Sequence, residues 1–335
     1  MRIAVDAVGG DHGPDVVIEG VVAGARRFGV DLLLAGPEQE VRRSLARIDV
    51  AGVNIQVRDA PDLIAMDESP AQAVRRKPRS GIAVALEAVR SGEAGGMVSA
   101  GNSGAVMASA LVQLGRIPGV DRPAIASPLP SRRGYSLVLD LGAVTDPRPQ
   151  SLVQFAQMGA VYAERVMGIA HPTVGPLSNG EEATKGNALV QEAHALLAAA
   201  PGIHFHGNVE GRDIPRGVVD VVVTDGFTGN VALKIAEGAA SLVAEVIREE
   251  LTASLVTKLA AAVLKPAFAR AKKRIDYAET GGALLLGTNG VVVIAHGRSN
   301  MVAMENAIGV AARACQSHIT DAIAAALHQL HSEVA

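Results

Sequence analysis

The stretch Val218–Asn230, which reads VVDVVVTDGFTGN, decides the fold class. Its first six residues are apolar except for Asp220, as is typical of a strand that is covered on both faces. A polar, glycine-rich loop follows at once, and an alanine-rich helical pattern then covers 231–250. The same order of short β-branched run, loop and longer helix recurs along the chain. We therefore predict an α/β protein with a largely parallel sheet and helices on both faces.

The hydrophobic periodicity gives the expected elements outward from this stretch. Strands are predicted over 2–7, 31–34, 55–58, 97–99, 136–140, 173–177, 203–206, 218–224 and 291–295. Helices are predicted over 15–28, 38–48, 81–90, 105–114, 151–167, 185–200, 231–250 and 301–330. No internal repeat or Pro/Ser-rich linker is evident, so residues 1–335 are expected to form one catalytic α/β domain, with a two-lobed form as the alternative.

The composition limits the compartment and the chemistry. A chain with one cysteine forms no internal disulfide and no cysteine-rich metal site, which fits a reducing cytoplasm. The N-terminus lacks the apolar run of a signal peptide. Two uncharged stretches, 94–115 and 280–297, are interrupted by glycine and asparagine and are therefore read as short elements joined by loops. We expect a cytoplasmic protein without a membrane span, a metal or a cofactor.

A basic amphipathic segment stands out from this acidic chain of net charge −3. Between Thr252 and Ile275 there are six basic residues and no acid: Lys258, Lys265, Arg270, Lys272, Lys273 and Arg274. An apolar stripe runs through Leu255, Leu259, Ala262 and Val263, and Pro266 is expected to kink or end the helix. We predict a protruding helical segment over 238–278.

The partner of this segment should be anionic. A lipid surface, an acidic carrier protein and a nucleic acid are the candidates, and a merely solvated helix face is the plainer alternative. With no Trp, 3 Tyr and 5 Phe, the chain has few aromatic platforms on which bases would stack. Nucleic acid is therefore excluded.

Six polar loops follow predicted strands or lie close after them, which is where α/β proteins place their chemistry. They cover 6–11, 99–104, 140–143, 177–182, 207–213 and 224–230. Any one of them alone is ordinary turn chemistry, because tight turns need Gly, Asn and Asp. Together they predict one cleft, which contains Asp6, Gly9, Gly10, Asp11, Asp140, Asn179, Glu181, Glu210 and Asp213 in addition to the residues discussed below.

The loop Gly101-Asn102-Ser103-Gly104 is the best candidate for binding an anion. It follows an apolar strand and opens a helix, so backbone N–H groups and the helix dipole are expected to meet a phosphate there. It lacks the lysine of a Walker A motif, and no G-x-G-x-x-G follows the first strand. Inorganic phosphate is therefore favoured over a nucleotide.

No enzyme nucleophile is evident. A nucleophile elbow around Ser103 would need glycine two residues later, where this chain has Ala105. Cys315 lies in an apolar helical pattern, which predicts a buried structural thiol. No histidine spacing indicates zinc. Phosphate is itself a nucleophile, so acyl transfer to phosphate needs only positioning, oxyanion stabilisation and exclusion of water.

In this order the loops closely resemble those of the bacterial phosphate acyltransferases of phospholipid synthesis, over essentially the whole chain. The resemblance is carried by Asp6–Asp11, Gly101–Ala105, Leu177–Glu182 with Lys185-Gly186, Gly207–Ile214, Thr224–Asn230, and Gly281–Ala283 with His296-Gly297. It implies an isopropylmalate-dehydrogenase-like fold, related to phosphate acetyltransferase, and a homodimer without a cofactor. The implied reaction moves a fatty acyl group from acyl carrier protein to inorganic phosphate, and the acyl phosphate serves a membrane glycerol-3-phosphate acyltransferase.

The resemblance also implies peripheral attachment to the inner face of the cell membrane. It adds His296 to the predicted cleft and suggests roles for other residues there. Asn102 and Ser103 would donate to phosphate, Lys185 and Asn230 would stabilise an anionic oxygen, and Asn208 and Asp225 would orient the thioester.

Two departures from the family affect loop shape: Val144 stands where the family has Asn, and Lys77-Pro78-Arg79-Ser80-Gly81 replaces the family's Lys-Lys-Asp-Ser-Ser. A phosphate acetyltransferase that uses acetyl-CoA and a non-catalytic carrier-protein-binding scaffold are the alternatives.

Overall fold

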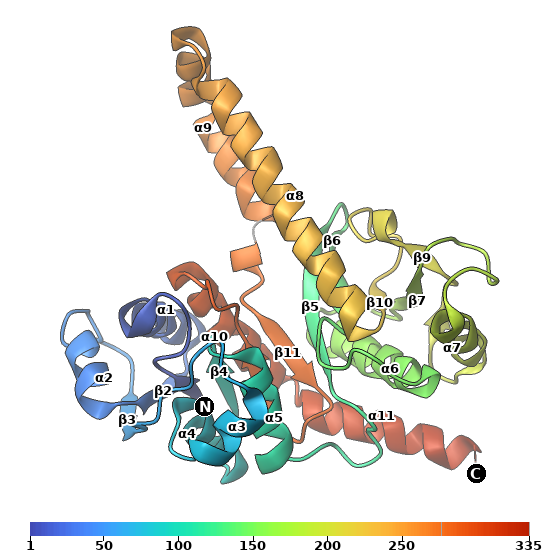
Figure 1. Cartoon of the computed structure of the whole chain (residues 1–335), viewed down its shortest axis with the longest axis horizontal. Coiled ribbons are helices and arrows are strands. Elements are labelled where there is room, and N and C mark those ends of the chain that lie inside the picture. The colour runs from blue at the N-terminus through green and yellow to red at the C-terminus, as the bar shows by residue number, and fades with distance from the viewer. Residues whose placement is uncertain (276, 335) are drawn as a thin grey trace.

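The computed structural model describes residues 1–275 and 277–334, and it contains one 12-stranded sheet with helices around it (Figure 1). The strands are β1 Arg2–Asp6, β2 Asp31–Gly36, β3 Ile55–Asp59, β4 Gly96–Ser99, β5 Ala124–Ser131, β6 Gly134–Leu139, β7 Thr173–Ser178, β8 His204–Phe205, β9 Val209–Glu210, β10 Val221–Val223, β11 Ala283–Leu286 and β12 Val291–Ile294. The helices are α1 Gly13–Phe28, α2 Glu38–Leu45, α3 Pro70–Arg76, α4 Gly81–Arg90, α5 Ser103–Gln113, α6 Pro149–Arg165, α7 Ala188–Ala199, α8 Gly226–Thr252, α9 Leu255–Ile275, α10 Met301–Gln316 and α11 Ile319–Val334. Short 3₁₀ turns cover Gly211–Asp213 and Tyr277–Glu279.

The strand order is β3-β2-β1-β4-β12-β11-β5-β6-β10-β7-β8, and β9 pairs with β7. Strands run parallel except in the middle, where β11 is antiparallel to β12 and to β5, and β5 is antiparallel to β6. The predicted largely parallel α/β fold is therefore confirmed. Because the strand direction reverses in the middle, β1, β4 and β12 form one parallel group, which we call the first lobe, and β6, β10 and β7 form another, the second lobe.

Both faces of the sheet are buried, as the apolar strand runs predict. Successive residues of a strand point to opposite faces. In β1, Ile3 and Val5 therefore join one hydrophobic cluster while Ala4 joins another, and in β10 Val222 is separated from its two neighbours in the same way. Helices α1, α6 and α10 contribute to the first cluster, and α4 and α5 to the second. This two-sided burial holds the strand ends, and so the loops that follow them, in fixed positions.

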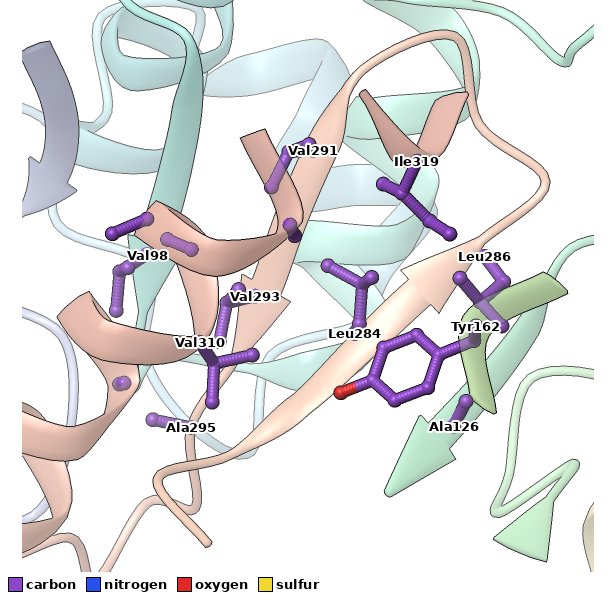
Figure 2. Packing of buried hydrophobic residues seen from close by; sticks show 14 of the residues in the cluster. Val98, Ala126, Tyr162, Leu284, Leu286, Val291, Val293, Ala295, Val310 and Ile319 are labelled. Atoms are coloured by element: carbon purple, nitrogen blue, oxygen red, sulfur yellow. The ribbon is translucent and has the colours of Figure 1, made fainter. Parts of the chain in front are cut away.

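The middle of the sheet carries the core that joins the lobes. Figure 2 shows Leu284 and Leu286 of β11 beside Tyr162 of α6, with Val310 of α10 and Ile319 of α11 nearby. All five side chains are at most 3% exposed. Burial raises the pKa of the Tyr162 phenol to about 12, so this group stays neutral at physiological pH.

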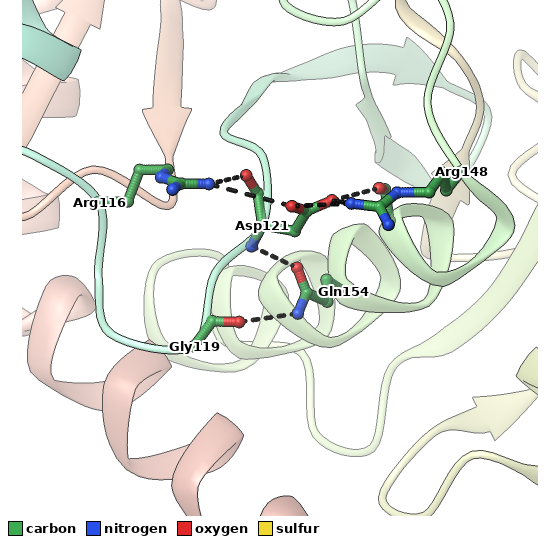
Figure 3. A network of polar contacts seen from close by, with 6 residues as sticks. Arg116, Gly119, Asp121, Arg148 and Gln154 are labelled. Atoms are coloured by element: carbon green, nitrogen blue, oxygen red, sulfur yellow. Dashed lines mark hydrogen bonds and ion pairs between the residues drawn. The ribbon is translucent and has the colours of Figure 1, made fainter.

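A polar network fixes the connection between α5 and β5, where the chain passes from one lobe to the other (Figure 3). The side-chain amide of Gln154 on α6 accepts from the Asp121 N–H at 2.8 Å and donates to the Gly119 carbonyl at 2.9 Å. The Asp121 carboxylate also pairs with Arg148 at 3.3 Å and with Arg116 at 4.0 Å. Several hydrogen bonds and ion pairs therefore hold the connection between α5 and β5 against the second lobe.

Helices α8 and α9 form a hairpin, here called the arm, that projects far from the body (Figure 1). Every residue from 241 to 250 is exposed, and so are Lys258, Lys265, Arg270, Lys273 and Arg274. The side chain of Lys272 lies outside the described residues. The predicted protruding helical segment is confirmed, and its first helix begins within the body at Gly226.

Several local predictions are wrong. Pro266 does not end the helix, which was one of the two expectations for it, because it lies inside α9, which continues to Ile275. The carbonyl that loses its partner there belongs to Ala262, an exposed residue that water can reach. The helix predicted over 301–330 is broken into α10 and α11 at His318, whose φ is +50°. The sequence analysis also missed α3 and the strands β5, β9 and β11. Among the described residues, no helix has both the length and the apolar character that a membrane crossing requires.

Candidate active site

A buried carboxylate organises the loops of the first lobe. The Ser99 hydroxyl at the end of β4 donates to Asp6 at 2.7 Å, and its oxygen accepts from the Gly101 N–H at 3.0 Å. The Ala295 N–H donates to the Ser99 carbonyl at 2.8 Å, and Asp11 N–H donates to the Gly297 carbonyl at 2.8 Å. The loops after β1, β4 and β12 therefore meet at one edge; the first two are among the six polar loops of the sequence analysis, and the third carries His296.

Glycines make this close approach possible. A Cβ atom on Gly9 would lie 2.5 Å from an Asp6 oxygen and 2.7 Å from the Gly101 nitrogen, and one on Gly81 would also collide with the Asp6 carboxyl. Burial raises the pKa of Asp6 to about 6, against the opposing effect of hydrogen bonds from Ser99 and Val8. The carboxyl therefore titrates well above its ordinary range, and through Ser99 it contacts the start of the Gly101–Gly104 loop.

The structure gives the Asn102 side chain a different role from the predicted one. Its oxygen caps α5 by accepting from the Ala105 N–H at 3.0 Å. Its amide nitrogen donates to the carbonyls of Met66 and Glu68 at 3.0 and 2.9 Å, and to that of Ala65 at 3.3 Å. Both amide hydrogens are thereby used within the protein, so the side chain has no donor left for phosphate.

The backbone of the same loop does offer donors. Within the described part of the chain, no acceptor pairs with the N–H groups of Asn102, Ser103 and Gly104, which begin α5. Ser103 is exposed and Gly104 half-buried, so solvent reaches them. Free N–H groups at a helix N-terminus attract anions through their partial positive charge. The backbone of this loop therefore offers donors to an anion, although the Asn102 side chain has none left.

In the second lobe, Asp140 is buried and Asp225 is half-buried, and both carboxylates accept hydrogen bonds from backbone N–H groups. The buried Asp140 carboxylate accepts from the N–H groups of Ile125, Gly142, Ala143 and Val144, while burial raises its pKa. Asp225 caps α8 by accepting from the Thr228 N–H at 2.8 Å. The departure at Val144 is mild, because its N–H contacts Asp140 and its carbonyl accepts from the Gly226 N–H at 2.8 Å.

Lys185 lies on a loop that two asparagines hold in place. Asn179 accepts from the Gly186 N–H at 2.8 Å. The buried Asn208 donates to the Glu182 carbonyl at 2.8 Å, and its oxygen lies 2.9 Å from the His194 ring nitrogen Nδ1. Lys185 itself is exposed, and no described carboxylate lies within ion-pair distance of its ammonium group. The Lys185 ammonium, carried by a loop whose position is fixed, is suited to bind an anion.

The acidic residues predicted beside this loop form ion pairs. Glu181, Glu210 and Asp213 place one oxygen each within 4.8 Å of one another. Arg212 pairs with Glu210 at 2.5 Å and with Glu181 at 3.5 Å, while Arg216 lies 3.5 Å from Asp213. Glu210 and Asp213 also exchange bonds as a capping box of the 3₁₀ turn. The two arginines offset most of the negative charge, so this cluster stabilises its own loop.

One face of α8 links the two lobes. Asn230 donates to the Leu141 carbonyl at 3.0 Å in the second lobe. One turn further, the Lys234 nitrogen lies 2.9 Å from Nε2 of His296, which follows β12 in the first lobe. Burial and then the Lys234 charge lower the pKa of His296, so the imidazole is neutral at physiological pH. Lys234 was missed by the sequence analysis, although its i, i+4 spacing from Asn230 was a usable signal.

The described contacts thus place the predicted residues in two groups joined by α8. Asp6, Gly9, Gly10, Asp11, Gly101–Gly104 and His296 belong to the first lobe, and Asp140, Asn179–Lys185, Asn208–Asp213 and Asp225 belong to the second. Cys315 lies away from both, against Gly95 and Gly96. Burial raises its thiol pKa to about 11, which makes it a poor nucleophile at neutral pH.

Comparison with known sequences decides the family. The family model described as "Fatty acid synthesis protein" matches residues 1–321. A phosphate acyltransferase of Anaeromyxobacter sp. (strain K) is 52% identical over 331 residues, which cover 98% of this chain and 91% of the relative. The chain belongs to the phosphate acyltransferase family. Another member, from Geobacter sulfurreducens, is 50% identical over 308 residues, covering 92% of this chain and 89% of that one.

Solved structures at much lower identity share the fold of this family member. A phosphotransacetylase from Streptococcus pyogenes superposes with a TM-score of 0.62 at 19% identity, covering 94% of both chains. The EutD phosphotransacetylase from Staphylococcus aureus gives a TM-score of 0.59 at 16% identity, with the same coverage. At these identities the likeness shows the architecture alone.

Proposed function

We propose that this protein transfers a fatty acyl group from acyl carrier protein to inorganic phosphate, forming acyl phosphate for phospholipid synthesis. The observation that carries the proposal is the match to phosphate acyltransferases at 52% identity over 98% of the chain. The free N–H groups at the start of α5 supply a place for phosphate that is independent of this match.

The reaction needs no enzyme nucleophile. A phosphate oxygen held by the backbone of Asn102–Gly104 attacks the thioester carbonyl carbon, and the carbon–sulfur bond breaks as the carrier thiolate leaves. Negative charge develops on the carbonyl oxygen in the transition state, so a donor aimed at that oxygen lowers the barrier. Lys185 and the second amide hydrogen of Asn230 are our candidates for that donor.

The remaining polar residues are proposed to position these groups. Asn179 and Asn208 hold the Lys185 loop, and Asp225 fixes the start of α8 and therefore Asn230. The Asp6–Ser99 bond fixes the Gly101–Gly104 loop, which we call the phosphate loop, through the N–H of Gly101. These assignments replace the expectation that Asn102, Asn208 and Asp225 contact substrate directly.

The arm favours a macromolecular donor over acetyl-CoA. Leu255, Val256 and Val263 are 76–80% exposed beside the basic residues of α9. A small soluble thioester has no use for such a surface, whereas an acidic carrier protein or an anionic membrane has. We propose that the outer arm binds the inner face of the cell membrane, carrier protein or both, close to the membrane glycerol-3-phosphate acyltransferase.

A homodimer is also proposed, on the exposed apolar residues of the arm. Leu242, Val243, Val246 and Ile247 of α8 are 42–61% exposed, and a contiguous apolar surface of this kind is typical of an interface between subunits. Sedimentation of the purified protein at several concentrations tests this proposal. A monomer at all concentrations would contradict it.

The decisive experiment offers the purified protein four mixtures: long-chain acyl carrier protein with phosphate, acetyl-CoA with phosphate, and each of these donors without phosphate. We expect acyl phosphate, separated from the thioester donor before it is measured, only in the first mixture. Equal or better turnover with acetyl-CoA would favour a phosphate acetyltransferase. Carrier-protein binding without any product would favour a non-catalytic scaffold.

Lys185→Met tests the site. Loss of one donor to a developing oxyanion costs about 10²–10³-fold in kcat. The matched control is Arg132→Met, which removes an exposed cation from the β5–β6 hairpin. If the two variants are equally active, Lys185 does not act at the reacting centre.

A further inference from the structure

A pocket of about 390 Å³ adjoins the phosphate loop. Gly101 of that loop, together with Gly9 and Gly10, lines one side, and Val8, Ile64 and Ile82 contribute apolar walls. Pockets of roughly 300–1,000 Å³ accommodate small ligands. This cavity is therefore large enough for a substrate group and is continuous with the place where phosphate is proposed to bind.

The outer wall of the pocket is built on the phosphate loop itself. The segment 63–66 between β3 and α3 lines the pocket, and the Asn102 amide nitrogen donates to the carbonyls of Ala65 and Met66. On the other side, the Lys77 ammonium donates to the Leu63 carbonyl at 2.5 Å. The wall and the phosphate loop thus form one hydrogen-bonded unit, so a ligand in the pocket has a fixed position relative to the bound anion.

The lining selects against an anionic occupant. Its ionisable side chains are Asp6, Glu40 and Asp62, and it contains no lysine or arginine. These acids would repel a phosphate or the phosphate of a pantetheine arm. Leu63 and Met66 are 52% and 45% exposed, so two large apolar side chains at the pocket have no cover from the protein. An uncharged hydrocarbon chain fits both observations, because burying methylenes against such side chains is favourable.

We infer that this pocket receives the methylenes of the acyl chain nearest the thioester, so that Leu63 and Met66 determine which chain lengths are used. The inference rests on the proposed function. In this arrangement the thioester carbonyl lies at the pocket mouth, next to the backbone N–H groups that hold phosphate. The acyl chain then binds to the first lobe, while Lys185 belongs to the second.

Tryptophan substitution tests chain binding without relying on turnover, because the natural chain contains no Trp. Leu63→Trp and Met66→Trp each introduce a single indole at the pocket, at positions exposed enough to tolerate it. The control is Val112→Trp, since Val112 is 73% exposed in a separate groove on α5. With hexadecanoyl acyl carrier protein brominated in the chain near the thioester, we expect loss of emission from the pocket tryptophans and none from the control. Unbrominated donor should leave all three unchanged.

Steady-state kinetics give the second readout. The bulk of the indole should lower kcat/KM for hexadecanoyl carrier protein by about tenfold, equal to the loss of about two buried methylenes. The value for acetyl carrier protein, which has no methylene to place in the pocket, should stay within about twofold. The KM for phosphate should not change. Equal effects on both chain lengths, or no quenching of either pocket tryptophan in an active enzyme, would overturn the inference. Quenching without acyl phosphate formation by the wild type would instead overturn the proposed function and leave the chain-binding pocket in place.

Discussion

Strand β10 and helix α9 are both rich in small apolar residues, yet they lie at opposite extremes of exposure. Val221, Val222 and Val223 of β10 are at most 1% exposed, whereas Val256 and Val263 of α9 are 77% and 80% exposed. The strand is buried on both faces, against α6 on one and among residues of neighbouring strands and loops on the other, while the arm has only its own two helices. Apolar surface in the body therefore stabilises the fold, and in the arm it remains available for another molecule.

The largest test of this contrast compares Phe155→Ala in the body with Val263→Ala in the arm. Phe155 is fully buried, so its loss should lower the free energy of unfolding by about 3–5 kcal/mol. Val263 loses little contact, and its change should stay within about 0.5 kcal/mol. Urea unfolding measures both. A large cost at Val263 that grows with protein concentration would show that a second copy covers the arm.

Changing Lys258, Lys265 and Lys272 together to Glu tests the charge of the arm. Basic residues near an anionic membrane contribute about 1 kcal/mol each, so binding to phosphatidylglycerol liposomes should weaken by about 3 kcal/mol or more at low salt. The effect should shrink in high salt, because screening shortens to about 3 Å at 1 M. Liposome flotation and the KM for acyl carrier protein are the measurements.

Leu259→Glu complements this triple variant. Leu259 is 64% exposed, so the substitution places a charge on the apolar stripe without removing a lysine. It should impair lipid binding selectively and leave the donor KM near the wild-type value. If the triple variant folds but keeps wild-type liposome binding and donor KM, the arm is only a solvated helix face.

Asp6→Asn tests a buried charge of the body. The folded pKa of about 6 exceeds the ordinary 3.8, so the native state binds protons more tightly than the unfolded chain. The contribution of Asp6 to stability is thus fully present below about pH 3.8 and is lost as the pH rises to about 6. Relative to wild type, the variant should gain up to about 3 kcal/mol between pH 4 and pH 7. Urea unfolding at both pH values checks this, and a constant difference would show that Asp6 titrates normally.

The smallest expected effect is that of Val144→Asn, which restores the residue typical of the family. The backbone of Val144 makes its polar contacts, and its side chain only packs at the edge of the core. Stability should fall by about 1 kcal/mol and kcat should stay within about threefold. A change in kcat of tenfold or more would place this side chain in the chemistry.

The sequence alone was enough for those features that depend on local pattern. Runs such as Val218–Val223 predicted strands buried on both faces, and the Gly101–Gly104 loop predicted a helix start with free N–H groups. The basic charges and apolar stripe of α9 predicted an exposed arm. These inferences hold because periodicity, glycine content and charge are properties of neighbouring residues.

Only the tertiary structure decided which polar groups remain available. The Asn102 and Asn208 amides look like free donors in the sequence, but they donate to carbonyls that are distant along the chain, those of residues 65, 66 and 68 and of residue 182. Likewise β5, with Pro128 and Pro130, does not read as a strand, yet it pairs between β11 and β6. Lys234 meets His296 across 62 residues of sequence. A hydrogen-bond donor has one set of partners, and which residues supply them depends on how the chain packs.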